Sequence, residues 1–125
     1  MVVTPVQNKA LWVLEDDRGC QFVYEQTLDH RYQTRYFRSL QDFIQALKAD
    51  GPKPALIIAD LMLSDGNFLE FLTNSESDIL VIPFIIVSSV DDIDALRFCF
   101  KEGALDYLTK PFKKTNCLSR SRMCL

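Results

Sequence analysis

The chain alternates uninterrupted apolar runs with segments whose apolar residues recur at helical spacing. In the clearest run, ALIIA at 55–59, no polar residue interrupts the apolar ones. Such a run is typical of a strand buried on both faces of a parallel sheet. Comparable runs are ALWVL at 10–14 and VIPFIIV at 81–87, and shorter candidates cover 32–37 and 105–109. The pattern therefore predicts a sheet built from these strands.

Amphipathic segments separate the apolar runs. We expect helices over the ranges 21–29, 39–50, 68–72 and 91–103. At the start of the second range, Ser39 and Asp42 resemble a capping box, which marks the beginning of a helix. Because strands and helices alternate along the chain, we predict an α/β fold with one parallel sheet and helices on both faces.

A length of 125 residues favours a single domain with one core. We assign residues 1–9 to an N-terminal lead-in and residues 10–112 to the domain core. The remaining segment, 113–125, is basic and poor in apolar residues. We expect it to form either a last helix or the start of a linker.

The formal net charge of −3 argues against general nucleic-acid binding, which usually needs a basic face. No apolar run approaches the roughly 20 residues that span a bilayer, and the N-terminal segment lacks the features of a signal peptide. The cysteines show no C-x-x-C spacing, so neither a zinc site nor a redox motif is indicated. We therefore expect a cytoplasmic protein with reduced thiols and no membrane association.

Polar residues follow the predicted strands at the points where the strands end. They are Glu15 and Asp16, Asp60, Ser88, and Lys110. The carboxyl ends of parallel strands share one edge, where open α/β sheets bind their ligands. Taken alone, Asp60 could simply cap the next turn. Three neighbouring carboxylates repel one another unless a cation intervenes, and Mg²⁺ prefers such oxygen ligands.

These residue types suit phosphoryl transfer onto a carboxylate. Asp60 can act as the nucleophile, while Lys110 supplies a positive charge and Ser88 a hydroxyl donor for phosphoryl oxygens. A Mg²⁺ ion would screen the charge of the incoming group. The sequence therefore predicts a phosphoryl-acceptor site with a divalent cation.

Four stretches with these residues, WVLEDD, IIADLMLSDG, PFIIVSS and GALDYLTKPF, occur in order between about Ala10 and Phe112. Together they resemble the receiver domain of bacterial two-component response regulators. The resemblance implies a flavodoxin-like, doubly wound fold with a five-stranded parallel sheet in the order 2-1-3-4-5. It also implies a phosphorelay function, in which the domain is phosphorylated and its surface switches for a partner or output domain.

The resemblance assigns a role to each matching position. It implies the following: an acidic pair at Glu15 and Asp16, a phosphorylated Asp60, a Mg²⁺ ligand in the backbone carbonyl of Met62, a switch pair of Ser88 and Tyr107, and a catalytic role for Ser88 and Lys110. Under this interpretation, Mg²⁺ is held by Glu15, Asp16, Asp60 and the Met62 carbonyl. Three positions depart from the family pattern: Ser64 stands where proline is usual, Phe68 where glycine is frequent, and Ser89 where alanine is more usual. The tail departs most, because it lacks the regular apolar stripe of the family's last helix.

The resemblance further implies a sensor histidine kinase or a histidine phosphotransfer protein as the phosphoryl donor. An output domain could follow Leu125, and a homodimer could form through the fourth helix and the last strand. We expect no direct nucleic-acid binding by this domain.

The alternative function is that of a docking module that is never phosphorylated, and an aspartyl-phosphate phosphatase is a weaker alternative. Such phosphatases use a second Asp two positions after the nucleophile, where this chain has Met62, so we expect no turnover enzyme.

Overall fold

The computed structural model describes residues 9–74, 81–89 and 92–110. In this part of the chain, five parallel strands form one sheet in the order β2-β1-β3-β6-β7. The strands are β1 (Ala10–Leu14), β2 (Gln33–Phe37), β3 (Leu56–Ala59), β6 (Phe84–Ser88) and β7 (Asp106–Thr109). Strands β4 (Met62–Leu63) and β5 (Gly66–Asn67) form a separate hairpin. The predicted flavodoxin-like sheet with order 2-1-3-4-5 is therefore confirmed.

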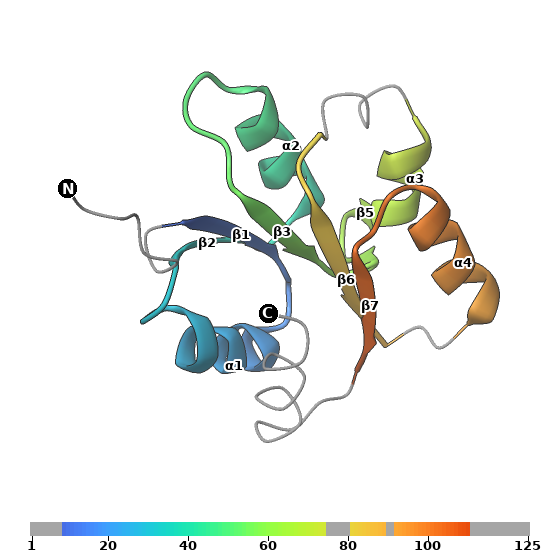
Figure 1. Ribbon diagram of the computed structural model, residues 1–125, viewed down its shortest axis with the longest axis horizontal. Helices are drawn as coiled ribbons and strands as arrows, with labels where there is room; N and C mark the ends of the chain where they lie inside the picture. The colour runs from blue at the N-terminus through green and yellow to red at the C-terminus, as the bar shows by residue number, and fades with distance from the viewer. Residues whose placement is uncertain (1–8, 75–80, 90–91, 111–125) are drawn as a thin grey trace.

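Helices cover both faces of this sheet (Figure 1). They are α1 (Arg18–Leu28), α2 (Leu40–Lys48), α3 (Phe68–Thr73) and α4 (Ile93–Lys101). Figure 1 shows α1 on one side of the sheet and the other three helices on the opposite side. This arrangement agrees with the predicted α/β architecture.

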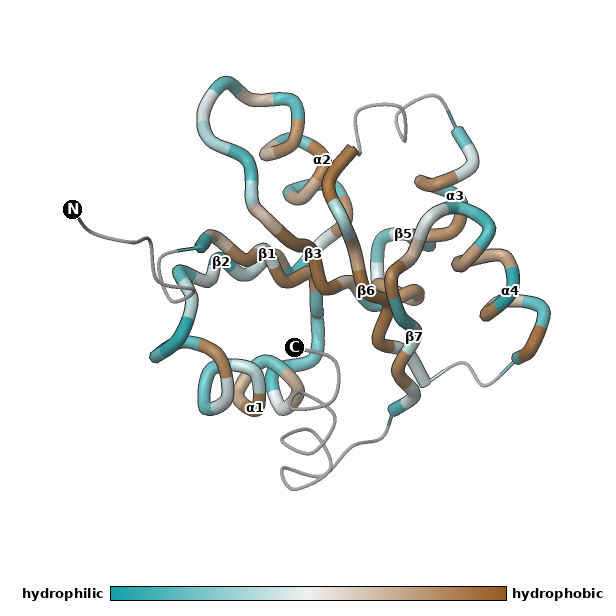
Figure 2. The backbone as a smooth tube through the Cα atoms, viewed as in Figure 1, coloured by the Kyte–Doolittle hydropathy of each residue, from teal (hydrophilic) through white to brown (hydrophobic). Residues whose placement is uncertain are grey.

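Alternation along the buried strands divides the core into two layers. Leu11 and Val13 of β1 pack with the α1 side, whereas Trp12 and Leu14 pack with the side of α2, α3 and α4, because successive strand residues point to opposite faces. The backbone in Figure 2 is accordingly most hydrophobic along the central strands. Both faces of the sheet are therefore closed to water over much of their area.

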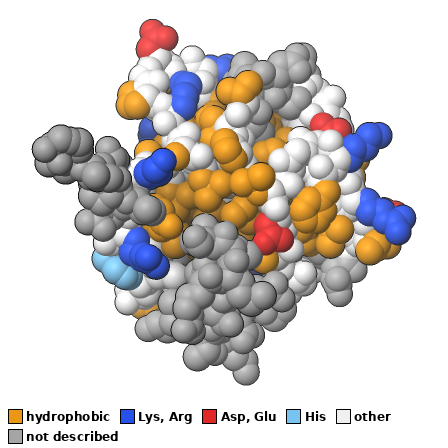
Figure 3. Space-filling view, viewed as in Figure 1, with side chains coloured by type: hydrophobic (Ala, Val, Ile, Leu, Met, Phe, Trp, Pro, Cys, Tyr) orange, Lys and Arg blue, Asp and Glu red, His pale blue; other side chains and the backbone are white. Residues whose placement is uncertain are grey.

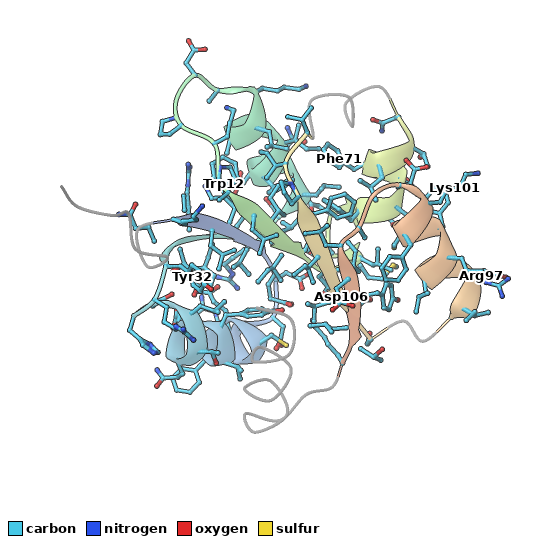
Figure 4. All side chains as sticks on the ribbon, in the orientation of Figure 1. Trp12, Tyr32, Phe71, Arg97, Lys101 and Asp106 are labelled. Carbon is cyan, nitrogen blue, oxygen red and sulfur yellow. The ribbon has the colours of Figure 1, made fainter. Side chains whose placement is uncertain are left out.

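Aromatic rings dominate the larger layer. The fully buried ring of Phe43 on α2 lies 5.7 to 6.3 Å from four other rings, namely those of Trp12, Phe37, Phe68 and Phe71. Tilted and edge-on ring pairs at such separations are favourable beyond their burial. Figure 4 labels Trp12 and Phe71, which reach this layer from β1 and α3. The cluster fixes α2 and α3 against the strands that carry the acidic residues.

Side-chain caps set the helix starts. Helix α1 begins at Arg18, earlier than predicted, because Asp17 Oδ2 accepts a hydrogen bond from the Cys20 N–H at 2.8 Å. Ser39 caps α2 as predicted, with its Oγ accepting from the Asp42 N–H at 3.1 Å. Short polar side chains just before a helix thus determine where it begins.

The ends of α4 agree broadly with the sequence. Asp92 is the N-cap and Asp94 lies in the first turn, whereas Asp91 lies outside the described residues. Gly103 directly follows the C-cap Glu102 and adopts a φ of 110°, a conformation that favours glycine. The predicted termination of this helix at Gly103 is confirmed.

Two strand predictions need correction. Strand β6 begins at Phe84, not at residue 81, because Pro83 has no N–H to donate and the side chain of Val81 is 87% exposed. The sequence predicted only a turn at residues 64–66, where the structure forms the β4–β5 hairpin.

The lead-in up to residue 8 and the tail 113–125 lie outside the described residues, so the proposed domain bounds stay predictions. Among the helices that the structure describes, none is long and apolar enough to cross a membrane.

On the face seen in Figure 3, hydrophobic side chains gather across the middle, with Lys and Arg side chains around them.

Candidate functional site

The acidic and basic residues predicted from the strand ends meet at one edge of the sheet. Backbone hydrogen bonds place them there: the Glu15 N–H donates to Phe37 O at 2.9 Å, and the Asp60 N–H donates to Leu14 O at 3.0 Å. The Lys110 N–H donates to Ser88 O at 2.7 Å, across the neighbouring pair of strands. Each functional side chain therefore starts from a position fixed by the sheet register.

Lys110 forms the centre of the site. Its Nζ lies 3.0 Å from Asp60 Oδ2 and within 3.0 Å of both carboxylate oxygens of Glu15. The side chain of Lys110 is 12% exposed, and those of Glu15 and Asp60 are 1% and 8% exposed. Three ionisable groups thus share a site that is largely closed to water.

Burial and the ion pairs shift two pKa values. Burial alone would lower the pKa of Lys110, but its hydrogen bonds to Glu15 and Asp60 outweigh that effect and raise the pKa above its usual value. Burial raises the pKa of Glu15, and the opposing effect of Lys110 is insufficient to reverse the shift. The difference follows from the contacts, because Lys110 faces two carboxylates whereas Glu15 faces one ammonium and the repelling Asp60.

The carboxylates of Glu15, Asp16 and Asp60 can hold a metal ion. One oxygen of each lies within 4.8 Å of the others. Glu15 Oε1 is buried and accepts no hydrogen bond from the described residues, although it lies 2.9 Å from the Lys110 Nζ. Three carboxylates that share one ammonium, and that offer only oxygen ligands, fit a hard cation such as Mg²⁺.

The hairpin after Asp60 closes over the acidic cluster. The Met62 N–H donates to Asp60 Oδ1 at 3.3 Å, and the Ser64 N–H donates to Asp16 Oδ2 at 2.9 Å. The Met62 side chain is 52% exposed and contributes no titratable group to the site. The backbone of this segment is therefore brought beside two of the three carboxylates.

The predicted switch residues lie on adjoining strands. Ser88 on β6 is fully buried and Tyr107 on β7 is 8% exposed. A pocket of about 450 Å³ beside Tyr107 is lined also by Asp92, Ile93 and Leu96 of the α4 region. The structure thus provides space next to the tyrosine on the α4 side of the sheet.

Sequence reasoning missed the contribution of Ser64 and Asp65. Ser64 binds Asp16 through its backbone, and Asp65 binds the backbone at the start of α2. The only signal for Ser64 was its departure from the usual proline, which has no N–H to donate. Neither contact could be read from local sequence, because the partners lie 48 and about 25 positions away.

Comparison with known proteins agrees with this geometry. The family model of the response regulator receiver domain matches residues 11–122. The DNA-binding transcriptional regulator NtrC of Proteus hauseri is 29% identical over 108 residues, which cover 86% of this chain and 22% of that protein. The two-component response regulator-like APRR1 of Arabidopsis thaliana is 35% identical over 91 residues, 70% of this chain and 15% of that protein. This chain thus spans about a fifth of the length of such relatives.

Solved structures show the same fold. The phosphorylated cyanobacterial phytochrome response regulator RcpA has a TM-score of 0.79 at 18% identity, covering 92% of this chain and 89% of that one. The Mn²⁺-bound form of response regulator Rcp1 has a TM-score of 0.79 at 20% identity, covering 93% and 91%. A receiver domain from Vibrio parahaemolyticus has a TM-score of 0.76 at 24% identity, covering 93% and 88%.

Three findings define the class of this protein: the residues that converge on one sheet edge, the order of the strands in the sheet, and the family match. The chain belongs to the family of response regulator receiver domains of two-component systems. The resemblance seen in the sequence is thereby confirmed.

The buried ion pairs predict a large effect of replacing Lys110. We expect Lys110→Met to lower the free energy of unfolding by roughly 3 kcal/mol at pH 7 without Mg²⁺, because two buried carboxylates lose their cation. Burial raises the pKa of Glu15 and Lys110 opposes this effect, so Glu15 should have a still higher pKa in folded Lys110→Met than in the folded parent. The variant should therefore gain more stability than the parent as Glu15 takes up a proton, and the loss should shrink between pH 7 and pH 5. Urea unfolding measures both effects.

Lys101→Met is the matched control. Lys101 is exposed in the last turn of α4 and is labelled there in Figure 4. Its replacement should change the unfolding free energy by only about 0.5 kcal/mol. Equal stability of the Lys110→Met and Lys101→Met proteins would contradict the importance of the buried pairs.

Proposed function

We propose that this receiver domain accepts a phosphoryl group on Asp60 from a phosphohistidine of a sensor histidine kinase or a histidine phosphotransfer protein. The observation that carries the proposal is the position of the Asp60 carboxylate. It lies at the end of a buried strand, 3.0 Å from a buried ammonium and beside two further carboxylates. The family match supports the same role. These partners would place the reaction in the cytoplasm.

The two oxygens of Asp60 are not equivalent. Oδ2 lies 3.0 Å from the Lys110 Nζ, whereas Oδ1 accepts, among the residues that the structure describes, only a longer hydrogen bond of 3.3 Å from the Met62 N–H. Oδ1 is therefore the freer oxygen and the one that we assign as nucleophile. In the transfer, an Asp60 O–P bond forms as the donor P–N bond breaks, and the imidazole leaves with the electron pair of that bond.

Glu15, Asp16, Asp60 and the backbone carbonyl of Met62 are the residues that we assign to Mg²⁺. The carboxylates outnumber the single ammonium of Lys110, so the site carries excess negative charge when all groups are ionised. Bound Mg²⁺ would neutralise this charge and orient phosphoryl oxygens. The Mn²⁺ in the structure of Rcp1 supports a divalent cation in this fold. We assign Lys110 and Ser88 to contact the transferred group.

Turnover as a phosphatase is less well supported. The position two residues after Asp60 is occupied by Met62, which can neither give nor take a proton. We therefore propose that the domain assists its own phosphorylation and dephosphorylation but is not a turnover enzyme. A docking module without phosphorylation would have no need for three carboxylates and a lysine within contact distance, so we consider that alternative weaker.

We further propose that phosphorylation shifts the surface formed by α4 and β7. Ser88 would donate to the phosphoryl group, and Tyr107 would move into the adjoining pocket of about 450 Å³. A ligand shifts such an equilibrium only if it favours one state. On α4, Ile93 and Phe100 are 61% and 43% exposed. This apolar face suits a partner, an output domain or a second copy of the chain.

The proposed acceptor predicts a single site of labelling. Incubation with Mg²⁺ and acetyl phosphate should label the peptide that contains Asp60, as measured by mass spectrometry, because Asp60 contacts Lys110 and is more accessible than Glu15, the other carboxylate that contacts Lys110: their side chains are 8% and 1% exposed. Asp60→Asn should abolish labelling, whereas Asp94→Asn, at an exposed position on α4, should leave it intact. Undiminished labelling of Asp60→Asn, or a label on Ser88, would contradict the assignment.

The proposed switch predicts a selective effect of Ser88. Beryllium fluoride, a phosphoryl mimic, should change the NMR shifts of α4 and β7 amides in the parent protein, and Ser88→Ala should reduce this response at least severalfold. A positioned hydrogen-bond donor is worth about 1 kcal/mol or more in a buried site. Ser89→Ala, at the exposed neighbouring position, should respond like the parent. A full response of Ser88→Ala would refute the coupling.

A further inference from the structure

The turn of the β4–β5 hairpin contacts two separate parts of the molecule. The Ser64 N–H donates to Asp16 Oδ2 at 2.9 Å. The next residue, Asp65, accepts from the Leu40 N–H at 2.8 Å with Oδ1 and from the Gln41 N–H at 3.0 Å with Oδ2. Two consecutive residues therefore connect the start of α2 with a carboxylate of the acidic cluster.

The hydrogen bonds to Asp65 supply acceptors for the first N–H groups of α2. The first N–H groups of a helix have no partner within the helix. Here Asp65 accepts from the first two helical residues, and Ser39 accepts from the third, Asp42, at 3.1 Å. Hydrogen bonds from Leu40 and Gln41 also lower the pKa of Asp65, so its carboxylate is ionised at neutral pH. The helix end thus receives a carboxylate from a residue far along the chain.

Close packing reinforces the same junction. A Cβ at Gly66 would lie 2.9 Å from Leu40 Cδ2, so the hairpin and the first residue of α2 approach nearly as closely as a glycine permits. Within the hairpin, Met62 pairs with Asn67 and Leu63 with Gly66. A shift at Asp65 would therefore be transmitted along the hairpin toward Met62.

We infer that Asp65 is a positioning residue for the cation site: it anchors the hairpin on α2 and so places the Ser64 N–H where it holds the carboxylate of Asp16. In this position, one oxygen of Asp16 lies within 4.8 Å of oxygens of Glu15 and Asp60. The inference rests on the proposed binding of a divalent cation. It makes the start of α2 part of the support of that site, although α2 contributes no side chain to the ion.

The contact path sets the expected size of the effect. Asp65 acts on the ion through Ser64 and Asp16, so its role is that of a partner outside the ligand set. Loss of such a partner typically weakens metal binding about 10- to 100-fold. Because a second bond path through the hairpin pairs remains, we expect the lower end of this range for Asp65→Ala.

The chain offers a matched control. Asp65→Ala and Ser39→Ala each remove side-chain acceptors from the start of α2. Only Asp65→Ala also detaches the hairpin, since Ser39 makes its capping bond within the α2 region. A general weakening of α2 would affect the site equally in both variants, whereas loss of the anchor would affect it only in the first. Asp65→Asn keeps one carbonyl oxygen as acceptor and should fall between Asp65→Ala and the parent.

The first measurement uses the protein without metal. Amide hydrogen exchange followed by NMR should show the Ser64 amide exchanging roughly 10-fold faster in Asp65→Ala than in the parent, because its bond to Asp16 opens more often. In Ser39→Ala, the Asp42 amide should exchange faster while Ser64 keeps its parent rate. Unchanged exchange of Ser64 in Asp65→Ala, or equal acceleration in both variants, would overturn the inference.

The second measurement is a Mg²⁺ titration followed by the fluorescence of Trp12, on the strand that leads into the site. Asp65→Ala should weaken Mg²⁺ binding roughly 10-fold, and Ser39→Ala should stay within about 2-fold of the parent. Equal affinities of Asp65→Ala and Ser39→Ala would overturn the inference. A parent protein that binds no Mg²⁺ would instead contradict the proposed function, a result that is distinct from a failed exchange experiment in the metal-free protein.

Discussion

The ammonium of Lys110 between the carboxylates of Glu15 and Asp60 is the interaction on which the site depends. The three side chains are nearly buried and in contact, so none can be removed without leaving a charge in a poorly hydrated place. The cation holds two acids together that would otherwise repel. It does so incompletely, because the pKa of Glu15 stays raised and Asp16 adds a further carboxylate nearby. The negative charge of the ionised carboxylates therefore exceeds the positive charge that Lys110 supplies.

The sheet topology makes this arrangement available. Glu15, Asp60 and Lys110 are separated by up to 95 positions, but each directly follows a strand of the same parallel sheet. Hydrophobic burial on both faces fixes the strand register, and the register fixes where each polar side chain emerges. The aromatic layer around Phe43 adds a second constraint, since it seats α2 and α3 against the strands. Apolar packing thus determines where the charged side chains of the site lie.

Much of this could be predicted from the sequence because the determining signals are local. Uninterrupted apolar runs identified β1, β3 and β6, and shorter mixed segments identified β2 and β7. An acid or lysine directly after a predicted strand identified the edge where Asp60 and Lys110 meet. Capping by Ser39 and the glycine after α4 were equally local signals. The roles of the site residues in phosphorylation and switching came from the family resemblance and stay proposals.

The features that were missed depend on contacts between distant segments. The β4–β5 hairpin is only two residues long on each side, too short for a strand pattern. The hydrogen bonds of Asp65 to α2 join residues about 25 positions apart. In the sequence, an aspartate before a glycine is equally typical of an ordinary turn that makes no such contact. Strand β6 was predicted to start too early because Val81 is apolar although it is exposed. Such assignments require the packed structure.

We propose that the buried acidic cluster needs a divalent cation in addition to Lys110. The most direct measurement is the free energy of unfolding as a function of Mg²⁺ concentration, with NaCl added to keep the ionic strength constant. An ion that binds only the folded protein should raise this free energy by about 1.4 kcal/mol per tenfold increase of Mg²⁺ above its dissociation constant. We predict this rise in the parent protein and its near absence in Asp16→Ala. No rise in the parent, or an equal rise in Asp16→Ala, would contradict the account.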